Sequence, residues 1–231
     1  MKNKYLKGAH LSERKFKEIL RLFAEDLTAT QIANISGVSR VTVNSYLKKI
    51  RQQIARHCES LLPAESHYRP AAPVRSVQHH ASSVEEGDVS VKTEVGRNVK
   101  PVVFGIYRCS DRLHSEILPD VSRSMIHSVV RSSRSILEMQ SAAEKIRRFS
   151  NVVDLGQYRL YNLENEGAVS IADDVDAFWG LTKHRLAKFK GLNRSTVYLH
   201  LKECEFRYNN RNEDIYETLL ELLKTQPLSL S

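Results

Sequence analysis

Hydrophobic residues recur at helical spacing over the first sixty positions of the chain. A first helix is predicted over about 12–27, and its inward face consists of Phe16, Ile19, Leu20 and Phe23. Thr28 and Gln31 have the spacing of a capping box, so a second helix is expected to start at Thr28. Ile32 and Ile35 are predicted to form the inward face of that helix.

A third helix follows, and its two sides differ. Gly37 is expected to end the second helix, and Ser39 is expected to cap the third. The predicted buried side of the third helix consists of Val43, Leu47, Ile50 and Ile54. Two helices joined by a short turn with a glycine form a helix-turn-helix, whose last helix starts in the major groove of DNA.

The exposed side of the third helix supplies candidate DNA contacts. The candidates for reading base edges are Arg40, Val41, Thr42, Asn44 and Ser45. Arg40 is suited to a guanine and Val41 to a thymine methyl group. The candidates for phosphate contacts are Lys48, Lys49 and Arg51. A three-helix bundle for protein contacts is the alternative interpretation; the short turn and the basic third helix favour DNA.

The helical pattern stops over residues 60–100, where proline, serine and histidine are frequent. We interpret this segment as a linker, although 88–95 alternates between apolar and polar residues as a strand does. His79 and His80 lack a cysteine partner nearby and are interpreted as solvated side chains. Residues 1–10 are basic without a hydrophobic period, and they are interpreted as a tail that touches a phosphate backbone or is disordered.

Residues 101–231 combine strand and helix patterns, so the predicted fold class is α/β. Two strands at 102–108 and 113–118 are expected to form a hairpin around Ser110 and Asp111. Ser122 is expected to cap a helix. The later elements are a helical stretch at 136–149, a short strand at 158–163, and helices at 173–189, 195–209 and 213–223. The predicted domains are 1–59 (helix-turn-helix), 60–100 (linker) and 101–231 (α/β).

The charge of the chain indicates a polyanionic partner. There are 35 Lys and Arg residues against 27 Asp and Glu residues, a formal net charge of +8. With a helix-turn-helix, double-stranded DNA is the partner that fits best. Three cysteines without a CxxC pair favour a reducing compartment, and no signal peptide or membrane-spanning run is evident. We therefore expect a cytoplasmic, nucleoid-associated protein without membrane contact.

One further stripe lies on the helix predicted at 173–189. Its residues recur three to four positions apart: Asp173, Asp176, Gly180 and Lys183. Two carboxylates and an ammonium on one face indicate either a catalytic face or the solvated side of an amphipathic helix. The basic residues expected to face DNA in this region are Arg185, Lys188 and Lys190.

Several motifs of the C-terminal part resemble one family of proteins. They are VVFGIYR at 102–108, EILPDVS at 116–122, VDLG at 153–156, FWGLTKHRLAKFKG at 178–191 and YLHLKECEFRYNNRNEDIYETLL at 198–220. On these motifs the chain resembles bacterial insertion-sequence transposases of the Merlin-related group, one branch of which begins with a helix-turn-helix. The resemblance implies that 101–231 is an RNase H-like mixed α/β domain with C-terminal helices, which in the family cuts and transfers DNA strands with two divalent metal ions.

The resemblance also assigns four catalytic positions. The family uses two aspartates, then Asn or Glu, then Lys, and the corresponding residues are Asp88, Glu144, Asp173 and Lys183. For the first position, the closest motif match at 64–69 has Ala64 in place of the ligand, so Asp88 is the other candidate. Glu144 stands where the family has Asp, and Asp173 where it has Asn. Only Lys183 carries the expected residue.

The packing and DNA-contact residues therefore resemble the family, whereas the metal ligands do not. We expect a sequence-specific DNA-binding protein derived from an insertion-sequence transposase, catalytically inactive, with no cofactor and no assigned metal site. Homo-oligomers are compatible with this function. The alternative is an active transposase that uses Mg²⁺ or Mn²⁺ with Asp88, Glu144 and Asp173. A protein-interaction scaffold without DNA affinity is a third class, which the basic third helix disfavours.

Overall fold

The computed structural model describes residues 4–7, 11–62, 102–118, 121–130, 146, 149–163, 169–188 and 194–229. A few of these, including 169–173, are described through their backbone alone. The predicted linker beyond residue 62, with its strand at 88–95 and its two histidines, lies outside the described residues. Most of the helical stretch predicted at 136–149 lies outside them as well. Met1–Leu61 and Pro101–Ser231 belong to one compact unit.

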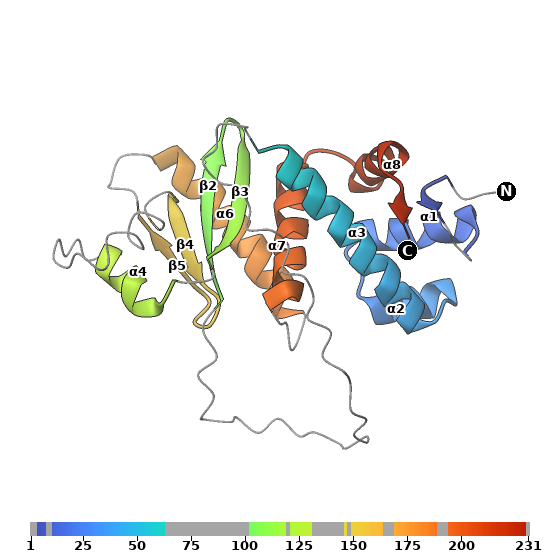
Figure 1. Cartoon of the computed structure of the whole chain (residues 1–231), viewed down its shortest axis with the longest axis horizontal. Helices are drawn as coiled ribbons and strands as arrows, with labels where there is room; N and C mark the ends of the chain where they lie inside the picture. Colours follow the sequence, from blue (N-terminus) through green and yellow to red (C-terminus); the bar gives the residue numbers. More distant parts are fainter. Residues whose placement is uncertain are drawn as a thin grey trace, which may run out of the picture. The chain divides into compact units, whose positions relative to one another are not determined.

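Three helices occupy the N-terminal segment, as predicted (Figure 1): α1 (Glu13–Ala24), α2 (Ala29–Ser36) and α3 (Arg40–Ser60). Thr28 and Gln31 form the expected capping box at the start of α2. Gly37 ends α2 with a φ angle of 67°, a left-handed conformation that glycine adopts without strain. The Ser39 hydroxyl accepts a hydrogen bond from the backbone N–H of Thr42 and so caps α3.

The buried faces of these helices follow the hydrophobic pattern with one exception. The predicted inward residues of α1 and α3 are all buried: Phe16, Ile19, Leu20, Phe23, Val43, Leu47, Ile50 and Ile54. In α2, Ile32 is buried, but Ile35 is 57% exposed, so the prediction for Ile35 is wrong. Ser36 takes the second inward position because it lies one turn beyond Ile32, and Ile35 is rotated about 100° from Ser36 toward solvent.

The C-terminal part contains a four-stranded antiparallel sheet made of β2 (Val103–Cys109), β3 (Arg112–Leu118), β4 (Asn151–Asp154) and β5 (Arg159–Asn162). The order across the sheet is β3-β2-β4-β5, and each neighbouring pair is antiparallel. The predicted hairpin joins β2 to β3, with Ser110 in the turn at a φ angle of 56°. The hydrophobic pattern predicted β2, β3 and β5 but not β4, because all four residues of β4 are buried and show no alternation between an inward and an outward face.

Helices cover both faces of this sheet (Figure 1); they are α4 (Arg123–Val130), α6 (Val169–Ala187) and α7 (Arg194–Asn209). On one face, Phe104 and Val153 pack in a cluster with residues of α6 and α7. On the other, Val103 and Val152 pack with Phe149 and with residues of α4. The described residues thus form a mixed α/β fold, which confirms the predicted class. An RNase H-like topology stays a prediction from the resemblance.

Gly105 in β2 makes a close contact that a side chain would block. A Cβ atom added there would lie 2.3 Å from two ring atoms of Phe149. We expect Gly105→Ala to lower the free energy of unfolding by about 1–3 kcal/mol, because the ring or the strand must shift. Gly180→Ala is the control, since nothing lies within 4 Å of a Cβ added there. The control should gain about 0.5–1 kcal/mol in urea denaturation; equal effects would show that the Phe149 ring moves without cost.

The helix α7 is the central element of the C-terminal part. Every side chain from Leu201 to Tyr208 is buried. α7 packs against α6 and β3, and also against α3 of the helix-turn-helix. The predicted helix at 195–209 is confirmed, and Phe206 and Tyr208 are buried on it.

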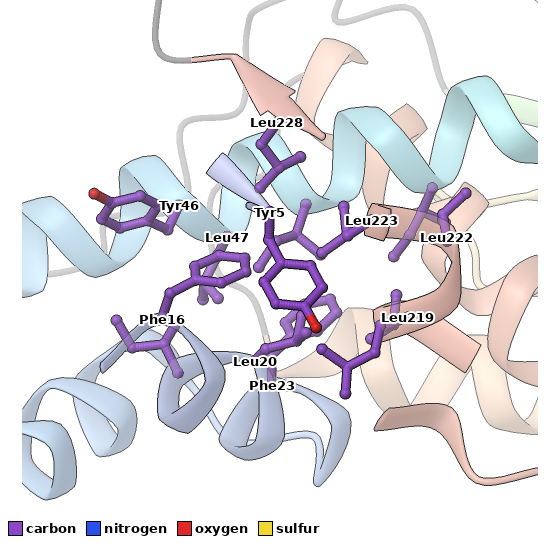
Figure 2. Packing of buried hydrophobic residues seen from close by; sticks show 14 of the residues in the cluster. Tyr5, Phe16, Leu20, Phe23, Tyr46, Leu47, Leu219, Leu222, Leu223 and Leu228 are labelled. Carbon is purple, nitrogen blue, oxygen red and sulfur yellow. The ribbon is translucent and has the colours of Figure 1, made fainter. Parts of the chain in front are cut away.

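The core of the helix-turn-helix includes residues from the far end of the chain. Phe16 and Leu47 lie in one buried cluster with Leu219 of α8 (Ile215–Thr225) and Leu228 of β6 (Leu228–Ser229). Figure 2 shows these side chains packed around the ring of Tyr5. The three N-terminal helices therefore share their core with α8 and β6.

The N-terminal residues also belong to this core. β1 (Leu6–Lys7) pairs in parallel with β6, and Leu6 lies opposite Leu228. Tyr5 is only 2% exposed, and its ring centroid lies 6.3 Å from that of Phe16. The alternative of a disordered tail over 1–10 is therefore wrong for residues 4–7, because the aromatic side chain of Tyr5 gains burial in this cluster, whereas a phosphate contact by this segment stays a prediction.

Candidate nucleic-acid interface

The start of α3 presents a polar surface on a firmly packed helix. The predicted contact residues that are exposed there are Arg40, Val41, Asn44, Ser45 and Lys48. Val41 is 80% exposed, which is unusual for a large apolar side chain. Val43 and Leu47 on the opposite side are buried in the shared core. The buried side of α3 thus holds the helix in place, and the other side of its first two turns is accessible to solvent.

Two of the predicted DNA contacts, Thr42 and Lys49, are half-buried rather than exposed. The Thr42 hydroxyl shares a hydrogen bond of 2.8 Å with the hydroxyl of Ser39, so Thr42 contributes to the helix cap. Lys49 is half-buried on the flank of α3. Both side chains lie beside the exposed surface rather than at its centre.

Arg51, a predicted phosphate contact, is largely buried. Its side chain is 12% exposed, and its Nε donates a hydrogen bond of 2.7 Å to Oε2 of Glu203 on α7. Its guanidinium carbon also lies 5.5 Å from the centre of the Phe23 ring, in a cation–π contact. A buried carboxylate thus holds this guanidinium inside the protein, and the phosphate contact by Arg51 stays a prediction.

Glu203 is the centre of a buried ionic cluster. Besides Arg51, it accepts a hydrogen bond of 2.6 Å from Arg185 on α6 and one of 3.0 Å from Arg207 on α7. Burial alone would raise the pKa of Glu203, but the three guanidinium groups outweigh burial and hold this pKa well below its usual range. The carboxylate is therefore ionised at neutral pH. We call Glu203, Arg51, Arg185 and Arg207 the Glu203 cluster.

The Glu203 cluster also reaches the turn between α1 and α2. Arg207 donates to the backbone carbonyls of Phe23 and Ala24, which caps the C-terminal end of α1. Asp26 in this turn has a φ angle of 64° and forms ion pairs with Arg185 and Lys188. Arg185 was expected to face DNA; this expectation is wrong, because its side chain is buried and paired with Glu203 and Asp26. Lys188 is exposed, and the expectation that it faces DNA stays a prediction. Lys190 lies outside the described residues.

A second buried group surrounds Glu205, two positions further along α7. Its Oε2 accepts a hydrogen bond of 2.8 Å from Lys202 and one of 2.7 Å from the Ser115 hydroxyl, and Nδ1 of His114 lies 3.4 Å from Oε1. Burial opposes ionisation of Glu205, but Lys202 and the hydrogen bonds lower its pKa to about 2. This group joins α7 to β3 inside the protein.

Of the four residues that the resemblance assigned to catalysis, only Lys183 has a side chain among the described residues. Asp88 and Glu144 lie outside them, and Asp173 is described only as a backbone position in α6. Lys183 is exposed on α6, and Asp176 is exposed on the same helix. Within the described part of the chain, no group of three or more His, Cys, Asp or Glu residues is placed to hold a metal ion.

Sequence reasoning missed the roles of Glu203 and Glu205. Both were part of the quoted motif at 198–220, and the only signal of their burial was that apolar and aromatic residues, such as Leu201, Cys204 and Phe206, stand close to them on several sides of the predicted helix. Among the residues that the structure describes, no helix has the length and apolar character needed to cross a membrane.

Comparison with known proteins identifies one similarity. Residues 9–59 match the family model described as bacterial regulatory proteins, luxR family. No curated protein and no solved structure matches the chain. The matched stretch spans α1, α2 and nearly all of α3, and it gives no support to a transposase origin. Residues 9–59 thus carry a helix-turn-helix of the luxR type, a class of domain that binds DNA.

Proposed function

We propose that this protein binds double-stranded DNA sequence-specifically and reads its site with the first two turns of α3. The observation that carries the proposal is the exposed surface of Arg40, Val41, Asn44, Ser45 and Lys48 on a helix whose other side is buried. Arg and Asn side chains form paired hydrogen bonds with guanine and adenine in the major groove. The net charge of +8 favours association with the DNA backbone.

The proposal includes a setting for this activity. The protein works in the cytoplasm in contact with the nucleoid, and its DNA binding requires no metal ion or cofactor. Binding in the presence of a chelator supports this part of the proposal, and affinity that depends on added Mg²⁺ contradicts it.

Selection of bound duplexes from a random pool tests the proposed function directly. Once a preferred site is known, we expect Asn44→Ala to weaken binding to it by about 5–150-fold, because one paired base contact contributes about 1–3 kcal/mol. Gln52→Ala, an exposed amide two turns further along α3, is the matched control and should change little. Fluorescence anisotropy measures both affinities. Selection that enriches no sequence would overturn the proposal.

The selected site also reports on oligomeric state. Two helix-turn-helix units related by a two-fold axis read half-sites about 10–10.5 base pairs apart. A homo-oligomer is part of the proposal, so a palindromic site with this spacing supports it. A single asymmetric half-site would contradict it.

A transposase-derived origin, with the α/β part as an inactive catalytic domain of RNase H-like fold, is the finer form of the proposal. Its support is the motif resemblance over 102–220, together with the loss of expected residues at three of the four catalytic positions. Active strand cleavage is the competing function. Incubation of DNA with Mg²⁺ or Mn²⁺ separates the two: nicking that disappears in Asp88→Ala, Glu144→Ala or Asp173→Ala establishes the enzyme.

A further inference from the structure

We call the exposed start of α3 the reading surface; it consists of Arg40, Val41, Asn44, Ser45 and Lys48. Arg51 follows this surface along the helix, but its side chain points away from it. It follows Lys48 by three positions on α3, yet Lys48 is exposed whereas Arg51 is 12% exposed and bonded to Glu203. Its guanidinium also lies against the Phe23 ring of α1. One side chain of the reading helix is thus fixed simultaneously to α7 and to α1.

Three other side-chain hydrogen bonds join α3 to α7 and to Gln226 after α8, and all lie further from the reading surface. Gln53 bonds to Gln226, the Cys58 thiol donates to the carbonyl of Lys202 at 3.7 Å, and Glu59 accepts from the Tyr198 hydroxyl. The residues of α3 in these contacts are at positions 53, 58 and 59. Of these anchors, Arg51 is therefore the nearest to Asn44 and Lys48.

The partner of Arg51 is itself held from several directions. Glu203 is 1% exposed, and Arg185 and Arg207 bond to its other oxygen, Oε1. Arg207 continues to the carbonyls at the end of α1, and Arg185 to Asp26 in the turn before α2. The Glu203 carboxylate is thus held in place. The Arg51 side chain that bonds to it has little freedom to move, because the planar guanidinium fixes the direction of its hydrogen bonds as well as their length.

We propose that Arg51 is a positioning residue for DNA recognition: through Glu203 it sets the orientation of α3 relative to α1 and α2. This inference rests on the proposed function. Hydrogen bonds to base edges need donor–acceptor distances of about 2.7–3.2 Å, so a small rotation of α3 removes them. Attraction to phosphates acts over about 8–10 Å and tolerates the same rotation. Arg51 therefore controls selectivity between sequences more than affinity for DNA in general.

The test compares Arg51→Met with Arg56→Met, since Arg56 is an exposed arginine on the same helix. Affinity for the selected duplex and for a scrambled duplex is measured at several salt concentrations. For Arg51→Met we expect the ratio of the two affinities to fall at least about tenfold, because one or more base contacts are lost. The slope of log affinity for the scrambled duplex against log salt should stay at its wild-type value. Arg56→Met should leave the ratio unchanged.

A phosphate contact by Arg51 predicts the opposite pattern. In that case the salt slope decreases in magnitude by about 0.9 and the ratio is unchanged. This pattern, or wild-type values for both quantities, overturns the inference. Wild-type protein that prefers no sequence overturns the proposed function instead, so the two failures are distinguishable.

Folding of the variants is checked by urea denaturation, and affinities are corrected for the active fraction. If Arg51→Met does not fold, Arg51→Lys takes its place in the same measurements. Lys retains the charge but lacks the planar fork, so a partial fall of the ratio at constant salt slope is expected. A ratio equal to that of the wild type in folded Arg51→Lys, together with a normal salt slope, also overturns the inference.

Discussion

A fragment that ends at Leu61 is expected to remain unfolded, although it contains α1, α2 and α3 complete. It lacks the buried residues that complete their core: Phe206, Leu219, Leu220, Leu222, Leu223 and Leu228. At this length a single core is marginal even when it is intact. Circular dichroism should show no cooperative thermal transition, and the fragment should not bind the selected duplex.

One substitution separates lost packing from lost chain length. Leu219 is fully buried in the shared core, so Leu219→Ala in the whole chain should cost about 2–5 kcal/mol of unfolding free energy. Leu61→Ala is the control because Leu61 is 40% exposed, and it should cost less than about 0.5 kcal/mol. A cooperative melt of the fragment, together with equal losses in the two variants, would show that the three helices fold without α8.

Glu203→Gln is expected to lower the free energy of unfolding by about 3–5 kcal/mol. The substitution keeps the shape of the side chain but removes the negative charge that Arg51, Arg185 and Arg207 share. Removal of one partner from a buried ionic group leaves the remaining charges without compensation, and this cost exceeds what the intact group contributes. Urea denaturation at neutral pH measures the loss.

Glu221→Gln provides the matched control for Glu203→Gln. Glu221 pairs with Lys224 on the surface of α8, and its side chain is 67% exposed. An exposed pair of this kind contributes about 0–1 kcal/mol and is screened by salt, whereas the loss at Glu203 should persist at high salt. If Glu203→Gln costs no more than the control, the three arginines must reach other partners or water, and the cluster would not hold α3.

The helix-turn-helix could be predicted from sequence because its signals are local. The capping box at Thr28 and Gln31, the left-handed Gly37 and the cap at Ser39 each act within four residues of chain. The hydrophobic stripe of α3 then identifies its inward face. Such features need no knowledge of distant residues, and the comparison with known families matched the same stretch.

The partners of charged residues could not be predicted in the same way. Arg51 and Arg185 resemble surface residues in sequence, since both belong to basic stretches. Their burial depends on Glu203, which is 152 positions from Arg51 along the chain. The burial of charged residues on α7 could not be predicted for the same reason. This helix is buried on all sides, so it has no polar face that would identify its orientation, and Glu203 and Glu205 are paired inside the protein rather than solvated.

The candidate catalytic site rests on a different kind of inference. Asp88, Glu144 and Asp173 were assigned by motif resemblance, and no periodicity or spacing in the chain places them near one another. The family model that matches the chain covers 9–59, where the local signals are strongest. The DNA-reading surface therefore follows from the residues themselves, and the catalytic assignment stays a prediction.

The core that the three N-terminal helices share with α8 and β6 has a consequence for the time course of synthesis. A ribosome adds about 5–20 residues per second, and roughly 160 residues separate the end of α3 from Leu219. For about 10–30 seconds the nascent chain carries a complete reading helix without the side chains that cover its core. During this interval Phe16, Phe23 and Leu47 are available to chaperones, and an interrupted chain would not compete with the finished protein for its DNA site.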